Sequence, residues 1–443
     1  MENTDESVSA GTYVFLLFLT LINIMNFVDR QLLASFANWI VPELGLTDTE
    51  FGLLTGLVFL FFYSVAGVFM GMLADRYNRI RLISIGLALW SALTAASGAA
   101  KGFVSLAIPR LFIGVGESML TPNATSLLAD KFPPSRRGFA IGVYYMGVPI
   151  GVATSLLVVA YLEPILGWRG CFYALGALGL ALALVVLLIK EPKRTTDVAV
   201  EVEVEQPTFR EMLSILWGAM SKSPALALTI LGGVSYHFML GAATFEQLWF
   251  VEERGYDRTE IAMLTGWLGL AGGILGNLAG GIGGDAFLRK TGIGRPMFVF
   301  WVMLIMMPFM LVRLFVEPGT FFFEGCIFLG YFLLGCFYGP TFATVQDLVP
   351  TQIRATVIAF YILSVNLVGV AIGVSFAGIA IDIMRQSGVA DPYTWALFGF
   401  TLFSTSAIPL FFFAGKRYAR DKEALHQSLK EAERASLGGN AFR

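Results

Sequence analysis

Apolar stretches of about 20 residues or more recur along the whole sequence, and this feature limits the possible folds more than any other. A helix needs about that length to cross the hydrocarbon core of a bilayer. Lipid permits only helices and closed β-barrels, because the backbone must satisfy its own hydrogen bonds, and barrel strands would be about 10 residues of alternating polarity. Charged residues make up only 14% of the chain, against about 25% in soluble domains. We therefore predict an all-α membrane protein.

The apolar stretches predict twelve transmembrane helices. The residues before the first stretch are few and acidic, with no basic region, so we expect the first stretch to be a true span and not a cleaved signal peptide. The predicted spans cover residues 12–39, 51–74, 82–100, 105–129, 138–161, 170–189, 224–250, 260–284, 297–316, 321–347, 355–383 and 394–415.

Lys and Arg residues predict the orientation of these spans, because basic residues near span ends are retained in the cytoplasm. Of the 30 basic residues, we count 22 on one side and three within or at the ends of spans. The opposite side carries only Lys101, Arg169, Arg254, Arg258 and Arg385. Both termini are therefore predicted to be cytoplasmic.

The spans divide into two groups of six around a polar stretch. We predict an N-terminal six-helix bundle (1–189), a cytoplasmic linker (190–223), a C-terminal six-helix bundle (224–415) and a cytoplasmic tail (416–443). Transporters are often built from such internal repeats. We expect a pseudo-twofold axis to relate the bundles.

Two sequence echoes support this repeat. Gly71 and Asp75 after the second span match Gly281 and Asp285 after the eighth at an offset of 210, and Asp130, Pro133 and Arg137 match Asp347, Pro350 and Arg354 at an offset of 217. Acidic and basic residues beside a glycine can hold neighbouring helix ends together, although the basic residues could equally serve topology alone. The residues predicted to form a cytoplasmic gate are Gly71, Asp75, Arg76, Arg79, Arg137, Asp285 and Arg354.

Four charged residues at membrane depth are the main functional candidates. Asp29, Arg30, Arg110 and Glu117 fall inside predicted spans, where an ionisable residue costs several kcal/mol unless it is paired or hydrated. A rise of about 1.5 Å per residue puts them in one layer. Steps of four, three and four join Arg110, Gly114, Glu117 and Thr121 on one helix face, which we expect to line a cavity.

The charges suggest exchanging ion pairs. Asp29 and Arg30 are consecutive and point about 100° apart, so each requires another partner. We predict that Asp29 pairs with Arg110 and Arg30 with Glu117, and that protonation of a carboxylate exchanges the pairs, although a different assignment is possible. Asp29, Glu117 and Arg110 would then couple protons, and Arg30 with Glu117 would bind an anionic substrate. The alternative is a static network that holds two helices together.

Several other activities find no support in the sequence. There is no GxxxxGK[ST] phosphate loop, no pair of nucleophile and base that would indicate an enzyme, and no metal-ligand spacing among Cys171, Cys326 and Cys336. No basic patch suggests nucleic acid. We expect no cofactor and no metal, and we interpret His237 in the seventh span as a packing residue.

Several motifs resemble the major facilitator superfamily. GMLADRYNRIR (Gly71 to Arg81) is similar to its cytoplasmic loop signature, and RLFIGVG (Arg110 to Gly116) resembles its fourth-helix signature. Gly142 to Gly151 loosely resembles the glycine–proline signature of its antiporters. NFVDRQ (Asn26 to Gln31) with GVGES (Gly114 to Ser118) resembles the Spinster family in particular, and a bacterial Spinster homologue is suspected.

The resemblance implies a substrate class. Animal Spinster relatives move sphingosine-1-phosphate and lysophospholipids, so the likeness implies a proton-coupled transporter of an amphipathic, anionic, lipid-like substrate. It also implies alternating access in a bacterial inner (plasma) membrane. Protons, the substrate and the bilayer are the expected partners of a monomer. The alternatives are a transporter of drugs or small organic anions, a non-transporting sensor, and a passive lipid scramblase.

Overall fold

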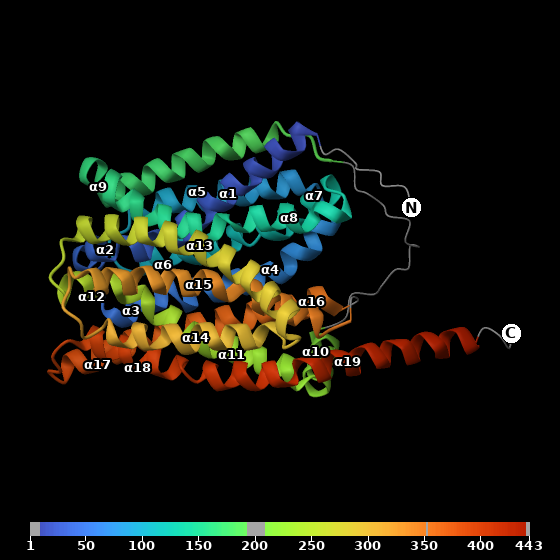
Figure 1. Cartoon of the computed structure of the whole chain (residues 1–443). Coiled ribbons are helices and arrows are strands. Elements are labelled where there is room, and N and C mark those ends of the chain that lie inside the picture. Colours follow the sequence, from blue (N-terminus) through green and yellow to red (C-terminus); the bar gives the residue numbers. More distant parts are fainter. Residues whose placement is uncertain (1–8, 193–208, 351–352, 440–443) are drawn as a thin grey trace. The chain divides into compact units, whose positions relative to one another are not determined.

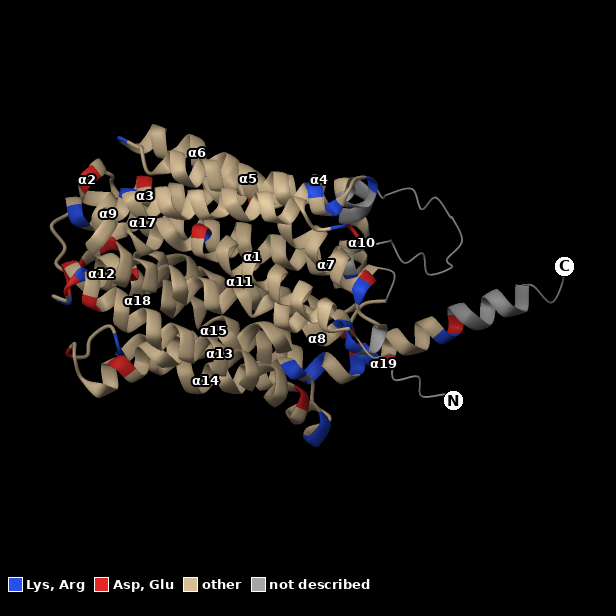
Figure 2. Cartoon of the chain, turned by 90° about the horizontal axis from the view of Figure 1, so that it is seen from above, with Lys and Arg blue, Asp and Glu red and all other residues tan. Residues whose placement is uncertain are grey.

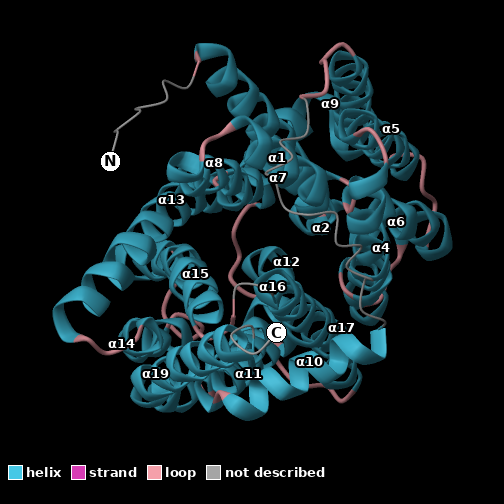
Figure 3. Cartoon of the chain, turned by 90° about the vertical axis from the view of Figure 1, so that its right-hand side faces the viewer, coloured by secondary structure: helices cyan, strands magenta, loops and turns pink. Residues whose placement is uncertain are grey.

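The structure is a computed structural model, and it describes residues 9–192, 209–350 and 353–439 (Figure 1). Within these residues every regular element is helical, and Figure 3 shows no strand in them. The predicted all-α class is confirmed.

The helices of the N-terminal half are joined by short connections. They are α1 (Ala10–Ser35), α2 (Ala37–Leu44), α3 (Asp48–Thr55), α4 (Leu57–Arg76), α5 (Arg79–Ser97), α6 (Phe103–Glu117), α7 (Leu120–Lys131), α8 (Pro134–Tyr145) and α9 (Gly147–Leu187).

The helices of the C-terminal half include a 3-10 turn, η1, and a π-helical segment, η3. They are α10 (Phe209–Lys222), α11 (Pro224–Ala242), η1 (Ala243–Phe245), α12 (Glu246–Glu252), α13 (Arg258–Thr291), α14 (Arg295–Val312), α15 (Phe321–Asp347), α16 (Arg354–Leu363), η3 (Ser364–Ala371), α17 (Ile372–Gln386), α18 (Pro392–Ser404) and α19 (Ala407–Gly439).

Eleven segments of the described chain are long and apolar enough to cross a membrane. One of them, Arg136–Leu187, is 52 residues long, far more than the roughly 20 residues that a crossing needs. Gly167 interrupts it with φ 66° and ψ 165°, a conformation that glycine adopts without the steric cost of a Cβ. This kink divides α9 into two helices, so the segments agree with the twelve predicted spans.

Polar side chains and backbone geometry set the ends of several helices. Thr47 and Glu50 form a capping box at α3, which satisfies two otherwise unpaired backbone donors. Asn78 caps α5 by accepting a hydrogen bond from the Arg81 backbone. Figure 2 shows Lys, Arg, Asp and Glu mostly at helix ends, with long uncharged stretches between them. This is the pattern expected of helices whose middles lie in lipid.

The chain packs into two compact units whose boundaries differ from the halves of the sequence. Unit 1 contains residues 1–202, 241–271 and 371–396, and unit 2 contains residues 203–240, 272–370 and 397–443. Unit 1 therefore combines the N-terminal half with parts of α11, α13 and α18 and with α17. The predicted bundles rest on sequence symmetry rather than on packing, and they remain a prediction.

Candidate functional site: an intramembrane charge cluster

Four buried charged residues lie together in unit 1. They are Asp29 and Arg30 of α1 with Arg110 and Glu117 of α6, named here the intramembrane charge cluster. Asp29, Arg110 and Glu117 are only 1–5% exposed. Removing such charges from water costs several kcal/mol each unless other groups compensate. The predicted residues are thus brought together, although their roles in proton coupling and substrate binding remain predictions.

The Arg30–Glu117 contact is the ion pair that the sequence predicts. Arg30 Nε and Nη2 both lie 3.0 Å from Glu117 Oε2. The Glu117 side chain is fully buried, whereas that of Arg30 is 17% exposed. The Arg30 side chain is therefore the more accessible partner of this pair.

Aromatic rings surround the Arg30 guanidinium. Its central carbon lies 4.3 Å from the ring centre of Tyr63, 4.7 Å from that of Phe27 and 5.3 Å from that of Phe59. Such cation–π contacts contribute about 0.5–2 kcal/mol, more when the cation is removed from water. No pattern in the sequence singled out these three rings, but they provide an apolar wall beside the charge.

Asp29 and Arg110 do not form the predicted ion pair. Arg110 Nη2 donates to the backbone oxygen of Arg30 at 2.6 Å, and Nη1 lies 3.5 Å from the backbone oxygen of Asp29. The Asp29 carboxyl instead accepts a hydrogen bond from Trp90 Nε1 at 3.1 Å. The predicted pairing therefore needs correction, because the Arg110 guanidinium reaches the α1 backbone rather than the side chain.

Each carboxyl group of the cluster has one oxygen without a hydrogen-bond partner among the described residues. Asp29 Oδ1 is buried and has no hydrogen-bond partner among the described residues, while Oδ2 is held by the fully buried Trp90. An unpaired buried carboxylate oxygen is costly, and a proton on Oδ1 would reduce that cost. Glu117 Oε1 is likewise buried without a partner, but Glu117 Oε2 pairs with Arg30, whereas Asp29 forms no ion pair among the described residues.

Close helix packing brings α4 to the cluster. A Cβ on Gly114 would lie 2.8 Å from the backbone oxygen of Phe59 and 3.1 Å from the backbone nitrogen of Tyr63, which no side chain can tolerate. The absence of a side chain at Gly114 thus lets α4 approach α6 and place both rings beside Arg30. We expected the face of α6 with Gly114 to line a cavity, but at this glycine the α4 backbone packs directly against α6.

His237 lies in unit 2 and has two hydrogen-bond partners. Its Nδ1 lies 2.7 Å from the backbone oxygen of Gly233, and its Nε2 lies 3.2 Å from the hydroxyl of Tyr338. A carbonyl only accepts, so Nδ1 carries the proton and Nε2 accepts from Tyr338. This arrangement agrees with a neutral packing histidine.

Arg79 is the best-connected of the predicted gate residues. Its Nε lies 2.9 Å from Glu191 and its Nη1 lies 2.5 Å from Asp130, and Nη1 also donates to Ser126 at 2.8 Å. We name these four residues the Arg79 cluster. All its members belong to unit 1, with Glu191 at the start of the predicted linker, and the Arg79 side chain is 3% exposed.

The other predicted gate residues of the N-terminal half are less connected. Gly71 and Asp75 belong to α4, and the structure describes only their backbone. Arg76 is exposed, and Arg137 donates to the backbone oxygen of Phe132 at 3.1 Å. Their assignment to a gate stays a prediction.

The second half contains a similar arginine-centred arrangement in unit 2. Arg295 Nε lies 2.8 Å from Asp285 and its Nη1 lies 2.7 Å from Asp347, so the predicted gate residue Asp285 is bound by an arginine that sequence reasoning did not select. Arg354 donates to a backbone oxygen of α15 at 3.0 Å. The echo of Asp130 in Asp347 thus recurs in structure, with each carboxylate bound by a nearby arginine.

Sequence reasoning also missed a charged network in unit 1 that is separate from the Arg79 cluster. Arg385 Nη2 lies 3.2 Å from Asp48, 3.3 Å from Glu252 and 3.0 Å from the Tyr393 hydroxyl. Tyr393 donates to Asp48 at 2.7 Å, and Asp382 accepts from the backbone nitrogens at the start of α3. We name these five residues the Arg385 cluster. It joins α3 of the N-terminal half to α12, α17 and α18 of the C-terminal half.

A further carboxylate, that of Glu253, supports this network. Glu253 accepts hydrogen bonds from the backbone nitrogens of Tyr393 and Thr394 at 2.7 and 2.8 Å, as a negative group at the start of a helix should. Burial raises the pKa of Glu253, while the hydrogen bonds from Thr394 oppose that shift. Glu253 thereby fixes the start of α18, which carries Tyr393.

Many apolar helices with a charge cluster buried among them define a polytopic membrane protein of the transporter class. The model of the Major Facilitator Superfamily matches residues 19–374. The chain belongs to this superfamily.

Its relatives include transporters of different kinds. It is 28% identical over 417 residues to an MFS-type efflux pump of Mycolicibacterium smegmatis, covering 91% of this chain and 92% of the pump. It is 28% identical over 313 residues to a probable sphingolipid transporter, spinster homolog 1, of Arabidopsis thaliana, covering 60% of this chain and 62% of that protein. The Spinster resemblance inferred from the motifs is therefore supported by a match over 60% of the chain.

A solved structure shares the fold. It is a bacterial homologue of the human lysosomal transporter Spinster, in an inward-facing and unoccupied conformation. The TM-score is 0.76 at 24% identity, with 95% of this chain and 99% of that chain covered. At this level of identity the likeness establishes the fold alone.

Proposed function

We propose that the chain is a proton-coupled secondary transporter that moves an amphipathic, anionic, lipid-like substrate by alternating access. The observation that carries the proposal is the buried Arg30–Glu117 pair with a second acid, Asp29, adjacent to it in the chain. A static contact between α1 and α6 could use apolar side chains at lower cost. Charges retained at membrane depth favour a functional role.

Charge balance links the substrate to the proton. The cluster contains two arginines and two carboxyl groups, so it is neutral when all four are ionised. An anionic head group on Arg30 would add one negative charge to a buried site, at a cost of several kcal/mol. Uptake of one proton by Glu117 or Asp29 restores neutrality. Anion and proton therefore favour each other's binding, and this reciprocal preference is the basis of coupling.

The surroundings of Arg30 suit an amphipathic substrate. Its planar guanidinium can bind a phosphate or carboxylate with two hydrogen bonds, and protonation of Glu117 would release it for that purpose. The rings of Phe27, Phe59 and Tyr63 offer apolar contact for an attached chain. The relative described as a probable sphingolipid transporter supports this substrate class.

The proposed setting is a bacterial inner membrane with both termini in the cytoplasm. The cytoplasmic position of the termini follows from the excess of Lys and Arg on their side. The bacterial inner membrane follows from the Spinster resemblance. In this orientation the gate residues predicted from the sequence, together with the Arg79 cluster, belong to the cytoplasmic side. The Arg385 cluster then belongs to the outer side.

A second candidate function is efflux of drugs or small organic anions. The mycobacterial efflux pump, which matches over nine-tenths of both chains, favours it. The two substrate classes differ in one requirement, since only a lipid-like substrate needs a long alkyl chain. A scramblase would ignore a pH gradient, and a sensor would bind without moving its ligand.

The test measures uptake of a fluorescent lysophospholipid into sealed proteoliposomes under an imposed pH gradient. We expect gradient-driven uptake in the wild type, a loss of at least ten-fold in Asp29→Asn, and no change in Glu260→Gln, an exposed acid that serves as the control. Short-chain analogues should be poor substrates. Equal gradient-driven uptake in wild type and Asp29→Asn would remove Asp29 from coupling. Uptake independent of the gradient would overturn the proposed mechanism.

A further inference from the structure

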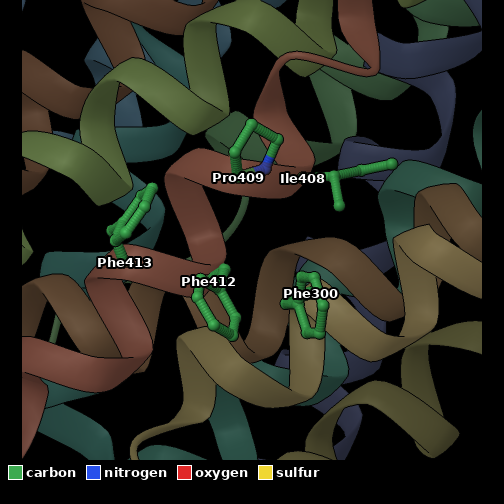
Figure 4. A pocket seen from close by; sticks show the side chains of 5 residues that line it. All are labelled: Phe300, Ile408, Pro409, Phe412 and Phe413. Carbon is green, nitrogen blue, oxygen red and sulfur yellow. The ribbon is translucent and has the colours of Figure 1, made fainter.

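An apolar groove lies between α14 and α19 within unit 2 (Figure 4). Phe300 of α14 and Ile408, Pro409, Phe412 and Phe413 of α19 line its volume of about 290 Å³. Small-molecule sites typically occupy about 300–1,000 Å³ and include a few polar groups. This groove is at the lower limit and its lining is entirely apolar, so it suits part of a hydrocarbon chain better than a compact polar ligand.

The groove is a consequence of how the two helices meet. A Cβ on Gly415 would lie 2.8 Å from Met297 Cβ, so α14 and α19 are in very close contact at that level. One turn away, the bulky rings of Phe300 and Phe412 pack with their centres 5.1 Å apart. The helices are thus in close contact at Gly415 and are held further apart by Phe300 and Phe412 one turn away. The groove lies beside these two rings.

A lysine follows the groove on the same face of α19. Ile408, Phe412 and Lys416 are spaced by four residues, which places them one above another on a helix. The Lys416 ammonium lies 4.4 Å from the Phe412 ring centre, and the side chain forms no ion pair with any described residue. Arg420, one turn further, is also exposed. A positive charge thus marks one end of an apolar groove.

We propose that this groove and Lys416 form a binding site for an anionic phospholipid of the surrounding membrane. The acyl chain would lie against Phe300, Phe412 and Phe413, and the phosphate would contact the Lys416 ammonium. Charge complementarity favours this occupant, because a basic residue at the end of a membrane-spanning helix attracts anionic lipid head groups. The site is separate from the intramembrane charge cluster, so the inference does not rest on the proposed function.

The two parts of the site have different roles. An acyl chain is already out of water in a bilayer, so the groove contributes packing but little discrimination between lipids. Selection among head groups therefore depends on Lys416. We expect the protein to prefer an anionic over a zwitterionic lipid of the same chains by roughly five-fold at this site, the size of one basic residue's attraction.

Native mass spectrometry of the detergent-solubilised full chain can test this. The wild type, Lys416→Gln and Arg417→Gln are titrated with phosphatidylglycerol and with phosphatidylcholine of identical chains. Arg417 is an exposed basic residue at the next position, so it controls for loss of one charge nearby. We expect one tightly held phosphatidylglycerol in the wild type and in Arg417→Gln, with the preference lost in Lys416→Gln.

A fluorescence measurement places the acyl chain. The ring centres of Trp301 and Phe300 lie 4.9 Å apart, so brominated-chain phosphatidylglycerol should quench a signal that is missing in Trp301→Phe. That quenching should weaken in Lys416→Gln and not in Arg417→Gln. No preference in the wild type, or an equal loss of preference in both charge variants, would overturn the proposal. Preference that depends on Lys416 without quenching of Trp301 would reject the groove as the chain site.

Discussion

The Arg79 and Arg385 clusters of unit 1 both centre on an arginine that contacts two carboxylates, yet they differ in burial. The Arg79 side chain is 3% exposed and that of Arg385 is 48% exposed. Breaking a buried pair costs about 3–5 kcal/mol, whereas an exposed pair contributes about 0–1 kcal/mol. The Arg79 cluster is therefore expected to stay formed. In the Arg385 cluster the Arg385–Glu252 pair, 48% and 41% exposed, can break and re-form at low cost, although the Asp48 side chain is only 5% exposed.

The two clusters also connect different parts of the chain. The Arg79 cluster joins α5 and α7 to Glu191, which directly follows the N-terminal half at the start of the predicted linker. The Arg385 cluster joins α3 to segments of the C-terminal half. In a transporter whose halves move against each other, strong contacts belong within a half and weak ones between halves. The difference in burial follows this division.

Removing the buried arginine should have the largest effect. Arg79→Gln leaves the Asp130 and Glu191 carboxylates without their shared cation, and we expect a loss of about 3–5 kcal/mol in stability. It should appear as a large fall in the thermal unfolding temperature of the detergent-solubilised protein. Arg81→Gln is the matched control, because Arg81 is exposed at the same helix start. Equal effects of both substitutions would contradict a special role for burial.

The contrast between the clusters also shows what the sequence could predict. The four intramembrane charges stood out because charge is costly where hydrocarbon surrounds it, whereas Arg79 and Asp130 stood out through the loop motif and its repeat in the second half. Arg385 was used only to orient the spans and was not selected as a functional residue, since an arginine between two predicted spans is ordinary. Its partner Asp48 lies 337 residues away in the chain, and no local pattern encodes such a contact.

Within the charge cluster, the limit of prediction was the choice of partner. Helix periodicity placed Arg110 and Glu117 on one face of α6, but it left the assignment of partners open, and of the two predicted pairs only Arg30–Glu117 is formed. The contact of Asp29 with Trp90 depends on how α5 packs against α1, which periodicity within one helix does not specify. The use of backbone oxygens by Arg110 was equally hidden, because every residue carries such an acceptor.

Weakening the contact between the halves should change a conformational equilibrium more than stability. We expect Arg385→Gln to increase the population in which this end of unit 1 is open by about five-fold, equivalent to about 1 kcal/mol. Double electron–electron resonance between spin labels at Lys101→Cys and Ser387→Cys, both exposed positions, would report the longer distance. The background would lack Cys171, Cys326 and Cys336.

Arg169→Gln provides the control for this experiment. Arg169 pairs with Glu43 at 2.9 Å and donates to the backbone oxygens of Gly98 and Ala100, all within the N-terminal half. Its loss should leave the distance distribution unchanged. If Arg169→Gln and Arg385→Gln shift the distribution alike, the Arg385 cluster has no particular part in closing this end.

The smallest effect is expected at the exposed Glu43–Arg169 pair, through its dependence on pH. A hydrogen bond from Trp168, reinforced by Arg169, lowers the pKa of Glu43 below its ordinary value of 4.5. The folded protein therefore favours the ionised carboxylate, and this contribution is present above the unfolded pKa and is lost as pH falls through the folded one. Glu43→Gln should reduce stability by less than about 1 kcal/mol at pH 7, because the pair is exposed to solvent screening. The unfolding temperatures of variant and wild type should converge as the pH falls from 4.5 through the lowered pKa of Glu43. A constant difference across that range would mean that Glu43 acts through packing against Trp168 and not through its charge.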